Sequence, residues 1–367
     1  MLGINEITLL VKRAAQEAGF DLAGIAPARD FNELAYFPQW IADGHAGEMK
    51  YLEARDATGR LKRESLRIAA PWAESVIVCA INYNTAQPYS TQVNDRSRGW
   101  ISRYAWGQED YHESVLRRLR QVEGRLVAAL ASEPPSPPAS NGELSGALRT
   151  WCYVDTGPVI ERVYAKYAGV GWIGKNTCVL NQKLGSWLFL GVILTSLKLV
   201  ADLPAPDRCG ACTRCLDACP TNAFLGPYQL DANKCISYLT IEKRGGIAEE
   251  LRDGMGRHVF GCDICQDVCP WNRKAPASEA PEFQPREGFV NPALDWVAEM
   301  KADEFRQHFC GSPIRRTKLN GLRRNAVIAM GNSGNREFIP ALEKLRADED
   351  PVIAESAAWA VEKLHSL

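Results

Sequence analysis

The chain has 367 residues, of which 46% are hydrophobic and 24% are charged, and its formal net charge is −1. This length exceeds what one hydrophobic core usually holds, so we expect two or three domains. The near-zero charge excludes a uniformly basic nucleic-acid coat but allows a local basic patch. The first residues lack a secretory signal pattern, and the most apolar stretch, residues 187–200, is too short to span a bilayer. We therefore expect a cytoplasmic protein with no membrane segment.

Apolar periodicity predicts mixed helix and strand structure in the first 200 residues. Helical spacing occurs in residues 4–18 and 113–130, and strand-like apolar runs occur in residues 20–26, 75–83 and 187–200. This mixture indicates one α/β or α+β domain.

Two later segments differ from this pattern. Residues 132–142 are rich in proline, which removes backbone donors and fixes φ, so we expect a surface loop there. Past about residue 285 helical patterns dominate, and residues 325–331 are weakly echoed by residues 356–362, about 31 residues later. That spacing predicts a short pair of helical repeats.

The cysteines form two closely spaced runs. Twelve cysteines in a chain without a secretion signal are expected to be reduced, which favours metal binding or catalysis over disulfides. The run from Cys209 to Cys219 has the C-x2-C-x2-C-x3-C-P spacing of bacterial ferredoxins, whose fourth cysteine ligates the other cluster. The run Cys262, Cys265, Cys269 ends in the same C-x3-C-P but lacks one cysteine. We expect Cys235 to replace it.

The ferredoxin pattern predicts that the two runs exchange their fourth ligands. It assigns one 4Fe–4S cluster to Cys209, Cys212, Cys215 and Cys269, and the other to Cys219, Cys235, Cys262 and Cys265. Two tetrahedral zinc sites are the alternative, although zinc does not explain the full spacing. The remaining cysteines are expected to be small buried hydrophobes without chemistry: Cys79, Cys152, Cys178 and Cys310. A cluster relay requires an electron acceptor elsewhere in the chain.

A loop and a glycine-rich segment are the densest remaining candidates for chemistry. Residues 153–162 contain Asp155, and Gly169, Gly171 and Gly174 satisfy G-x-G-x-x-G. These glycines follow a helix pattern and not a strand, so a nicotinamide site is not indicated. The pattern alone favours a helix C-cap and tight turn at the glycines, with Asp155 capping a helix that begins around Pro158.

Residues 153–162, residues 169–176, the cysteine runs and Cys235-Ile-Ser-Tyr-Leu239 closely resemble the epoxyqueuosine reductases, over nearly the whole chain. The resemblance implies a cobalamin-dependent iron–sulfur enzyme, related to reductive dehalogenases, that reduces epoxyqueuosine at the tRNA wobble position to queuosine. It implies an α+β architecture with a nitroreductase-like cobalamin-binding domain in residues 1–200. A ferredoxin-like domain with two 4Fe–4S clusters would follow in residues 201–285. HEAT-like helices in residues 286–367 would contact tRNA.

The same resemblance implies the site residues. Asp155 matches the proton donor of the family, and opening an epoxide creates an alkoxide that needs a proton. The segments that match cobalamin-contacting regions contain Arg63, Ser102, Asp155, Lys175, Asn176 and Ser237. A histidine-bound cobalt is not indicated, because the Asp-x-His-x-x-Gly motif lacks its glycine after both His45 and His112.

Residues 315–324 contain five basic residues and no acidic one, as contacts to tRNA phosphates require, or as a solvated helix end allows. Other functions stay open at this point. A reductive dehalogenase would share both cofactors but normally carries a twin-arginine export signal, which is absent from this N-terminus. A non-enzymatic electron carrier and a zinc-stabilised RNA-binding module are further alternatives. An unidentified electron donor is expected as a partner.

Overall fold

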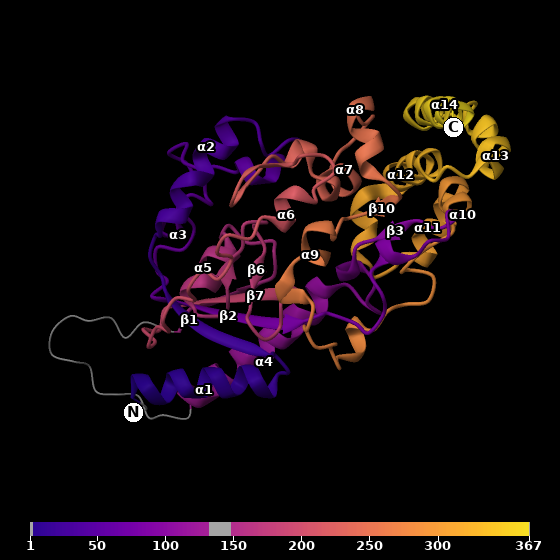
Figure 1. The fold of residues 1–367 in the computed structure, drawn as a ribbon. Helices are drawn as coiled ribbons and strands as arrows, with labels where there is room; N and C mark the ends of the chain where they lie inside the picture. Colours follow the sequence, from indigo (N-terminus) through magenta and orange to yellow (C-terminus); the bar gives the residue numbers. More distant parts are fainter. Residues whose placement is uncertain (1–2, 132–147, 367) are drawn as a thin grey trace.

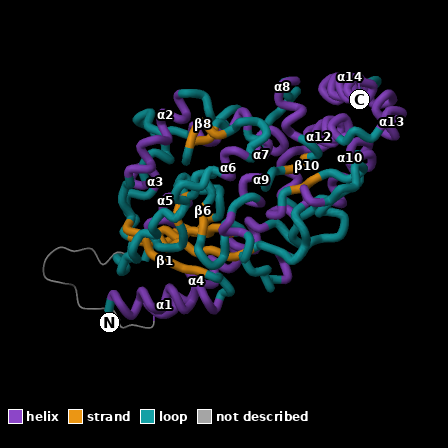
Figure 2. The backbone as a smooth tube through the Cα atoms, viewed as in Figure 1, coloured by secondary structure: helices purple, strands orange, loops and turns teal. Residues whose placement is uncertain are grey.

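The computed structural model describes residues 3–131 and 148–366 (Figures 1 and 2). The predicted proline-rich loop therefore lies outside the described residues. Within the described ranges, no helix is long and apolar enough to cross a membrane.

A four-stranded antiparallel sheet forms the centre of the N-terminal half. Its strand order is β1-β2-β7-β4, with β1 at Leu22–Pro27, β2 at Ser75–Asn82, β4 at Thr150–Tyr153 and β7 at Leu188–Thr195. All residues of β2 are buried, as expected for a central strand covered on both faces. The strands predicted in residues 20–26, 75–83 and 187–200 are confirmed with shifted ends.

Helices cover both faces of this sheet (Figure 1). Successive side chains of β2 alternate between the faces, because a strand has a period of two. On one face, α1 (Ile4–Glu17) and α4 (Tyr111–Ala131) pack against the odd-numbered residues Ile77, Cys79 and Ile81. On the other face, α5 (Glu161–Tyr167) packs against Val76, Val78 and Ala80. Both predicted amphipathic helices are thus confirmed.

The glycine-rich segment after α5 ends that helix. Gly169 has a φ of +71°, and the Val170 N–H donates back to the Ala165 carbonyl, as in a glycine C-cap. The short strands β5 (Trp172–Ile173) and β6 (Val179–Leu180) then form an antiparallel pair. The predicted cap and turn are confirmed.

The rest of the N-terminal part and the cysteine-rich segment form short helices and strands. The former contains α2 (Tyr36–Ala42), α3 (Leu66–Ala69) and β3 (Trp100–Ile101). The latter contains α6 (Arg214–Asp217), β8 (Phe224–Gly226), β9 (Gln229–Leu230), α7 (Ile236–Ile241), α8 (Glu249–Arg252), β10 (His258–Phe260) and α9 (Ile264–Asp267).

The C-terminal part is helical, with α10 (Leu294–Glu299), α11 (Ala302–His308), α12 (Lys318–Asn332), α13 (Ile339–Leu345) and α14 (Pro351–Ser366). The two echoing sequence segments lie on α12 and α14 and pack together. A Cβ placed on Gly331 would lie 2.9 Å from the Cβ of Ala360, so the glycine permits this close approach.

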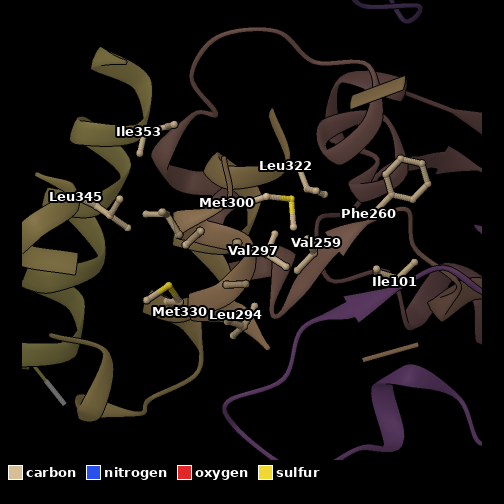
Figure 3. Close-up of a cluster of buried hydrophobic side chains, with 14 of the residues drawn as sticks. Ile101, Val259, Phe260, Leu294, Val297, Met300, Leu322, Met330, Leu345 and Ile353 are labelled. Carbon is tan, nitrogen blue, oxygen red and sulfur yellow. The ribbon is translucent and has the colours of Figure 1, made fainter. Parts of the chain in front are cut away.

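The core of the helical part includes residues from the other two parts of the chain. Figure 3 shows Val259 of β10 beside Val297 of α10, and Ile101 of β3 belongs to the same cluster. Strand β3 also pairs in parallel with β10. The domain boundaries at residues 200 and 285 stay predictions, and apolar packing crosses both. The α+β class is confirmed.

Candidate functional site

The first cavity is lined by cysteines from both runs. It has a volume of about 250 Å³, and its walls include Cys209, Cys212, Cys215 and Cys269. Burial raises the pKa of Cys215 to about 11, and the nearby Cys269 and Cys209 contribute to the shift. Cys269 therefore lies with the first run although it belongs to the second in sequence. This is the grouping that a crossed assignment requires.

The other four cysteines of the predicted set also lie together. Burial raises the pKa of Cys262 well above its usual value, and Cys235 and Cys219 add to this electrostatically. Cys265 interacts with Cys262 and Cys235 in the same way. The thiol of Cys178 also lies with this group, since it forms a hydrogen bond with Cys265. The sequence pattern gave no signal for this contact, since Cys178 stands alone.

The turn after α5 supports both cysteine groups. Lys175 Nζ donates to the carbonyls of Gly210 and Cys212, at 2.7 and 3.0 Å. Asn176 is buried, and its Nδ2 lies 3.4 Å from the Cys265 carbonyl oxygen. These two residues thus contact the cysteine loops directly. Their predicted contact with cobalamin stays a prediction.

Two other predicted cofactor contacts lie near the second cysteine group. Ser102 is buried, and its hydroxyl donates to Asp263 Oδ1 at 2.6 Å, next to Cys262 in sequence. Ser237 follows Cys235 on α7 and is half-buried, and its carbonyl accepts a hydrogen bond from Thr240. Their cofactor roles stay predictions as well.

The second cavity contains Asp155. It has a volume of about 640 Å³ and combines three distant parts of the chain, including Tyr51, Arg63, Asp155 and Arg316. Arg63 donates to the carbonyls of Tyr51 and Gly157, at 2.8 and 3.0 Å, and so ties the Asp155 loop to the N-terminal segment. The structure thus brings together the predicted residues Arg63 and Asp155.

Asp155 has a backbone conformation that is uncommon for a residue with a side chain. Its φ is +59°, in the left-handed region, and strain of this kind is concentrated at functional sites. Its carboxylate is 65% exposed. The sequence pattern favoured a helix cap, and that interpretation is wrong. Helix α5 begins at Glu161, its N-cap is Ile160, and no side chain caps it.

Two neighbours on one short segment surround the carboxylate. The Tyr111 hydroxyl donates to Asp155 Oδ2 at 3.0 Å, and His112 Nε2 lies 3.9 Å from the same oxygen. The Tyr111 ring stacks on Phe189 at 4.3 Å between centroids. Burial and the charge of Asp155 raise the pKa of Tyr111 well above its usual value. The tyrosine therefore stays a neutral hydrogen-bond donor.

Glu161, at the start of α5, is a second carboxyl close to Asp155. Burial, and then the charge of Asp155, raise its pKa to about 8. Its Oε1 is buried with no hydrogen-bond partner among the described residues, as is the hydroxyl of Tyr153. At neutral pH this carboxyl is therefore mostly protonated.

The predicted basic segment divides into exposed and internal residues. Arg324 is 2% exposed and donates to three backbone carbonyls, including that of Leu239 at 2.8 Å. Arg323 pairs with Asp348 at 2.5 Å. These two cannot neutralise phosphates, so that part of the prediction is wrong. Only Arg315 and Lys318 stay exposed without a described ion pair, while Arg316 lines the Asp155 cavity.

Sequence reasoning missed Tyr51, Tyr111 and Arg316 as neighbours of Asp155. The sequence Asp110-Tyr111-His112 at the start of α4 was considered only as part of a cobalt-binding motif. The one available signal was a run of three polar side chains at the start of a predicted helix.

Two family models match the chain. Residues 208–272 match the 4Fe–4S double cluster binding domain, and residues 63–156 match the family described as epoxyqueuosine reductase QueG, DUF1730. The first match covers every cysteine of the predicted cluster set. It overturns the zinc alternative.

Curated relatives extend this similarity over most of the sequence. The epoxyqueuosine reductase of Pseudomonas aeruginosa is 38% identical, with 96% of this chain and 93% of the relative covered. That of Xanthomonas campestris is 35% identical, with 96% and 94% covered.

Solved structures give the same result. An epoxyqueuosine reductase with an epoxyqueuosine-modified tRNA-Tyr stem loop has a TM-score of 0.84 and 30% identity, covering 99% of this chain and 91% of that one. The Bacillus subtilis enzyme, captured with its catalytic aspartate loop swung out of the active site, has a TM-score of 0.82 and 29% identity, covering 99% and 91%.

Proposed function

Because this chain belongs to the epoxyqueuosine reductase family, we propose that it reduces epoxyqueuosine at the tRNA wobble position to queuosine, with Asp155 as proton donor. The observation that carries the role of Asp155 is its strained, exposed carboxylate in a cavity of about 640 Å³. The relative whose catalytic aspartate loop is swung out of the active site supports the same role.

Residues 208–272 form a 4Fe–4S double cluster binding domain. We assign the two clusters by the crossed arrangement described above. The support is that Cys269 shares a cavity with the three cysteines of the first run, whereas Cys219 interacts with Cys262. Electrons would enter from an external donor and pass through this pair.

Cobalamin is proposed as the second cofactor. The cavity around Asp155 fits its chemistry in two respects. The cavity is wide and open, and Lys62, Arg63 and Arg316 offer donors for corrin amide or phosphate oxygens. When bound, reduced cobalamin supplies the electrons that open the epoxide. Ser102, Lys175, Asn176 and Ser237 are kept as proposed contacts.

The protein's own residues would position and protonate the substrate. The Tyr111 hydroxyl holds one oxygen of Asp155, and the exposed carboxyl can reach a base turned out of the anticodon loop. Protonation by Asp155 would convert the departing alkoxide into a neutral leaving group. Arg63 would keep the loop in place through its bond to Gly157.

The finer architecture belongs to the same proposal. We assign a nitroreductase-like fold to the N-terminal domain and HEAT-like repeats to the C-terminal helices, supported by the packing of α12 on α14. The exposed Arg315 and Lys318 are the proposed tRNA phosphate contacts. A cytoplasmic location follows from the substrate.

The test is anaerobic turnover of epoxyqueuosine-containing tRNA with added cobalamin and a chemical reductant, measured by nucleoside mass spectrometry. Asp155→Asn is the sharpest variant, because asparagine tolerates a positive φ and still accepts from Tyr111. We expect it to lower kcat by about 100-fold or more. Asp303→Asn, at a carboxylate 93% exposed on α11, is the matched control. Wild-type protein that binds both cofactors yet makes no queuosine would refute the proposal.

A further inference from the structure

Reduction of an epoxide to an alkene needs two protons. Both carbon–oxygen bonds break, a carbon–carbon double bond forms, and the oxygen leaves as water after taking up two electrons and two protons. The cofactors supply the electrons. A single carboxyl such as Asp155 donates only one proton before it must be reprotonated. Asp155 must therefore regain a proton within each turnover if it is to supply both.

Two of the titratable groups near Asp155 are poor sources. Tyr111 donates a hydrogen bond to Asp155, but its buried ring and the adjacent carboxylate oppose loss of its proton. Glu161 interacts electrostatically with Asp155, yet its buried Oε1 has no hydrogen-bond partner among the described residues. Neither group is therefore suited to deliver a proton to Asp155.

His112 is better placed to deliver a proton to Asp155. Its Nδ1 lies 2.7 Å from Asp110 Oδ1, and its backbone N–H donates to the same oxygen at 3.0 Å. Burial opposes ionisation of Asp110, but the hydrogen bonds from His112 hold the pKa of that carboxyl below its usual value. Asp110 thus stays ionised and orients Nδ1–H towards itself, which leaves Nε2 facing Asp155.

The remaining geometry suits proton transfer. His112 Nε2 lies 3.9 Å from Asp155 Oδ2, a gap that a small side-chain movement or one water closes. The imidazole is 28% exposed, so it can be reprotonated from solvent. The ring of Tyr111 lies against it at 4.0 Å between centroids, which limits its rotation.

We propose that His112, oriented by Asp110, supplies the second proton of each turnover by reprotonating Asp155. The Nε2–H bond of the imidazolium breaks as an O–H bond forms on Asp155, which then protonates the substrate oxygen a second time. Solvent restores the proton on His112. This inference rests on the proposed reaction. His112 acts through Asp155 and needs no contact with the substrate.

The kinetic test compares His112→Gln and Asp110→Asn with wild type in the turnover assay. We expect kcat to fall roughly tenfold or more with the KM for tRNA unchanged. Imidazole added to His112→Gly should restore much of kcat, and it should not rescue Asp155→Asn. His45→Gln is the matched control, because His45 also faces an aspartate, Asp231 at 3.7 Å, outside this cavity.

A second readout needs neither substrate nor turnover. In nitrogen-15 NMR of histidine side chains, the Nε2 signal of His112 should move in Asp155→Asn and stay in place in Asp303→Asn. The absorption of bound cobalamin should be the same in His112→Gln and wild type. Wild-type protein that makes no queuosine would refute the proposed function itself. Active wild type with a His112→Gln variant at the same kcat, or with no imidazole rescue of His112→Gly, would overturn the proton relay alone.

Discussion

For Asp155, the family resemblance and the local sequence pattern predicted different roles. The resemblance of residues 153–162 to a known family pointed to the carboxylate, whereas local pattern favoured a helix cap. The pattern failed because five more residues follow Asp155 before α5 begins at Glu161. Capping rules describe unstrained chain, and a φ of +59° at a non-glycine residue lies outside them.

Glu161 makes stability depend on pH. Its pKa is about 8 in the folded chain and about 4.5 in the unfolded chain. The stabilisation that comes from this raised pKa is fully present below pH 4.5. It is lost as pH rises to 8, and the free energy of unfolding falls by up to about 5 kcal/mol. Glutamine cannot ionise. The melting temperature of Glu161→Gln should therefore rise relative to that of wild type as the pH increases from 5 to 8. Circular dichroism melts measure this, with the exposed Glu343→Gln as control. Equal pH slopes in wild type and Glu161→Gln would contradict it.

Among the elements, strands and amphipathic helices were predictable, and the roles of charged residues on helices were not. Periodicity located α1, α4, β1, β2 and β7, because each buries one face or both in a single layered core. The basic run on α12 looked like an exposed patch. Arg324 instead enters the interior, where its donors meet backbone carbonyls that end α7 and the following turn. Such a contact over long sequence distance leaves no local signature.

Arg324 should therefore stabilise the junction between α7 and α12. Arg324→Met keeps much of the side-chain volume but leaves the carbonyls of Leu239, Lys243 and Gly245 without their donor. We expect it to destabilise the protein by about 3 kcal/mol, visible as a lower melting temperature. The exposed Arg315→Met should change stability by less than about 0.5 kcal/mol. Similar melting temperatures for both variants would show that Arg324 is not structurally important.

For the whole molecule, the spacing of the cysteines predicted long-range contacts, whereas composition did not. Ferredoxin-like spacing predicts that Cys269 joins the first run, and the cavity it shares with Cys215 agrees with that geometry. The boundaries at residues 200 and 285 were drawn from composition. Composition cannot reveal that β3 pairs with β10 or that Ile101 packs among the C-terminal helices.

The crossed assignment can be tested by combining cysteine substitutions. Cys269→Ala should remove one cluster and about half of the bound iron. Adding Cys215→Ala should remove no more, because both cysteines serve the same cluster. Adding Cys265→Ala instead should remove the second cluster. The exposed Cys310→Ala is the control and should keep all iron. Iron analysis and electron paramagnetic resonance measure the outcome, and the reverse pattern would establish uncrossed ligands.

The packing of β3 against the last helices also bears on how the chain is made. A ribosome delivers the N-terminal segment first, and most residues that share a core with Ile101 and Trp106 follow much later, from Phe289 onwards. Until those helices emerge, only residues of α7 and β10 can cover this apolar surface, and the rest of it is open to chaperones or to aggregation. A premature stop codon near the end of the gene would therefore damage a region encoded near its beginning.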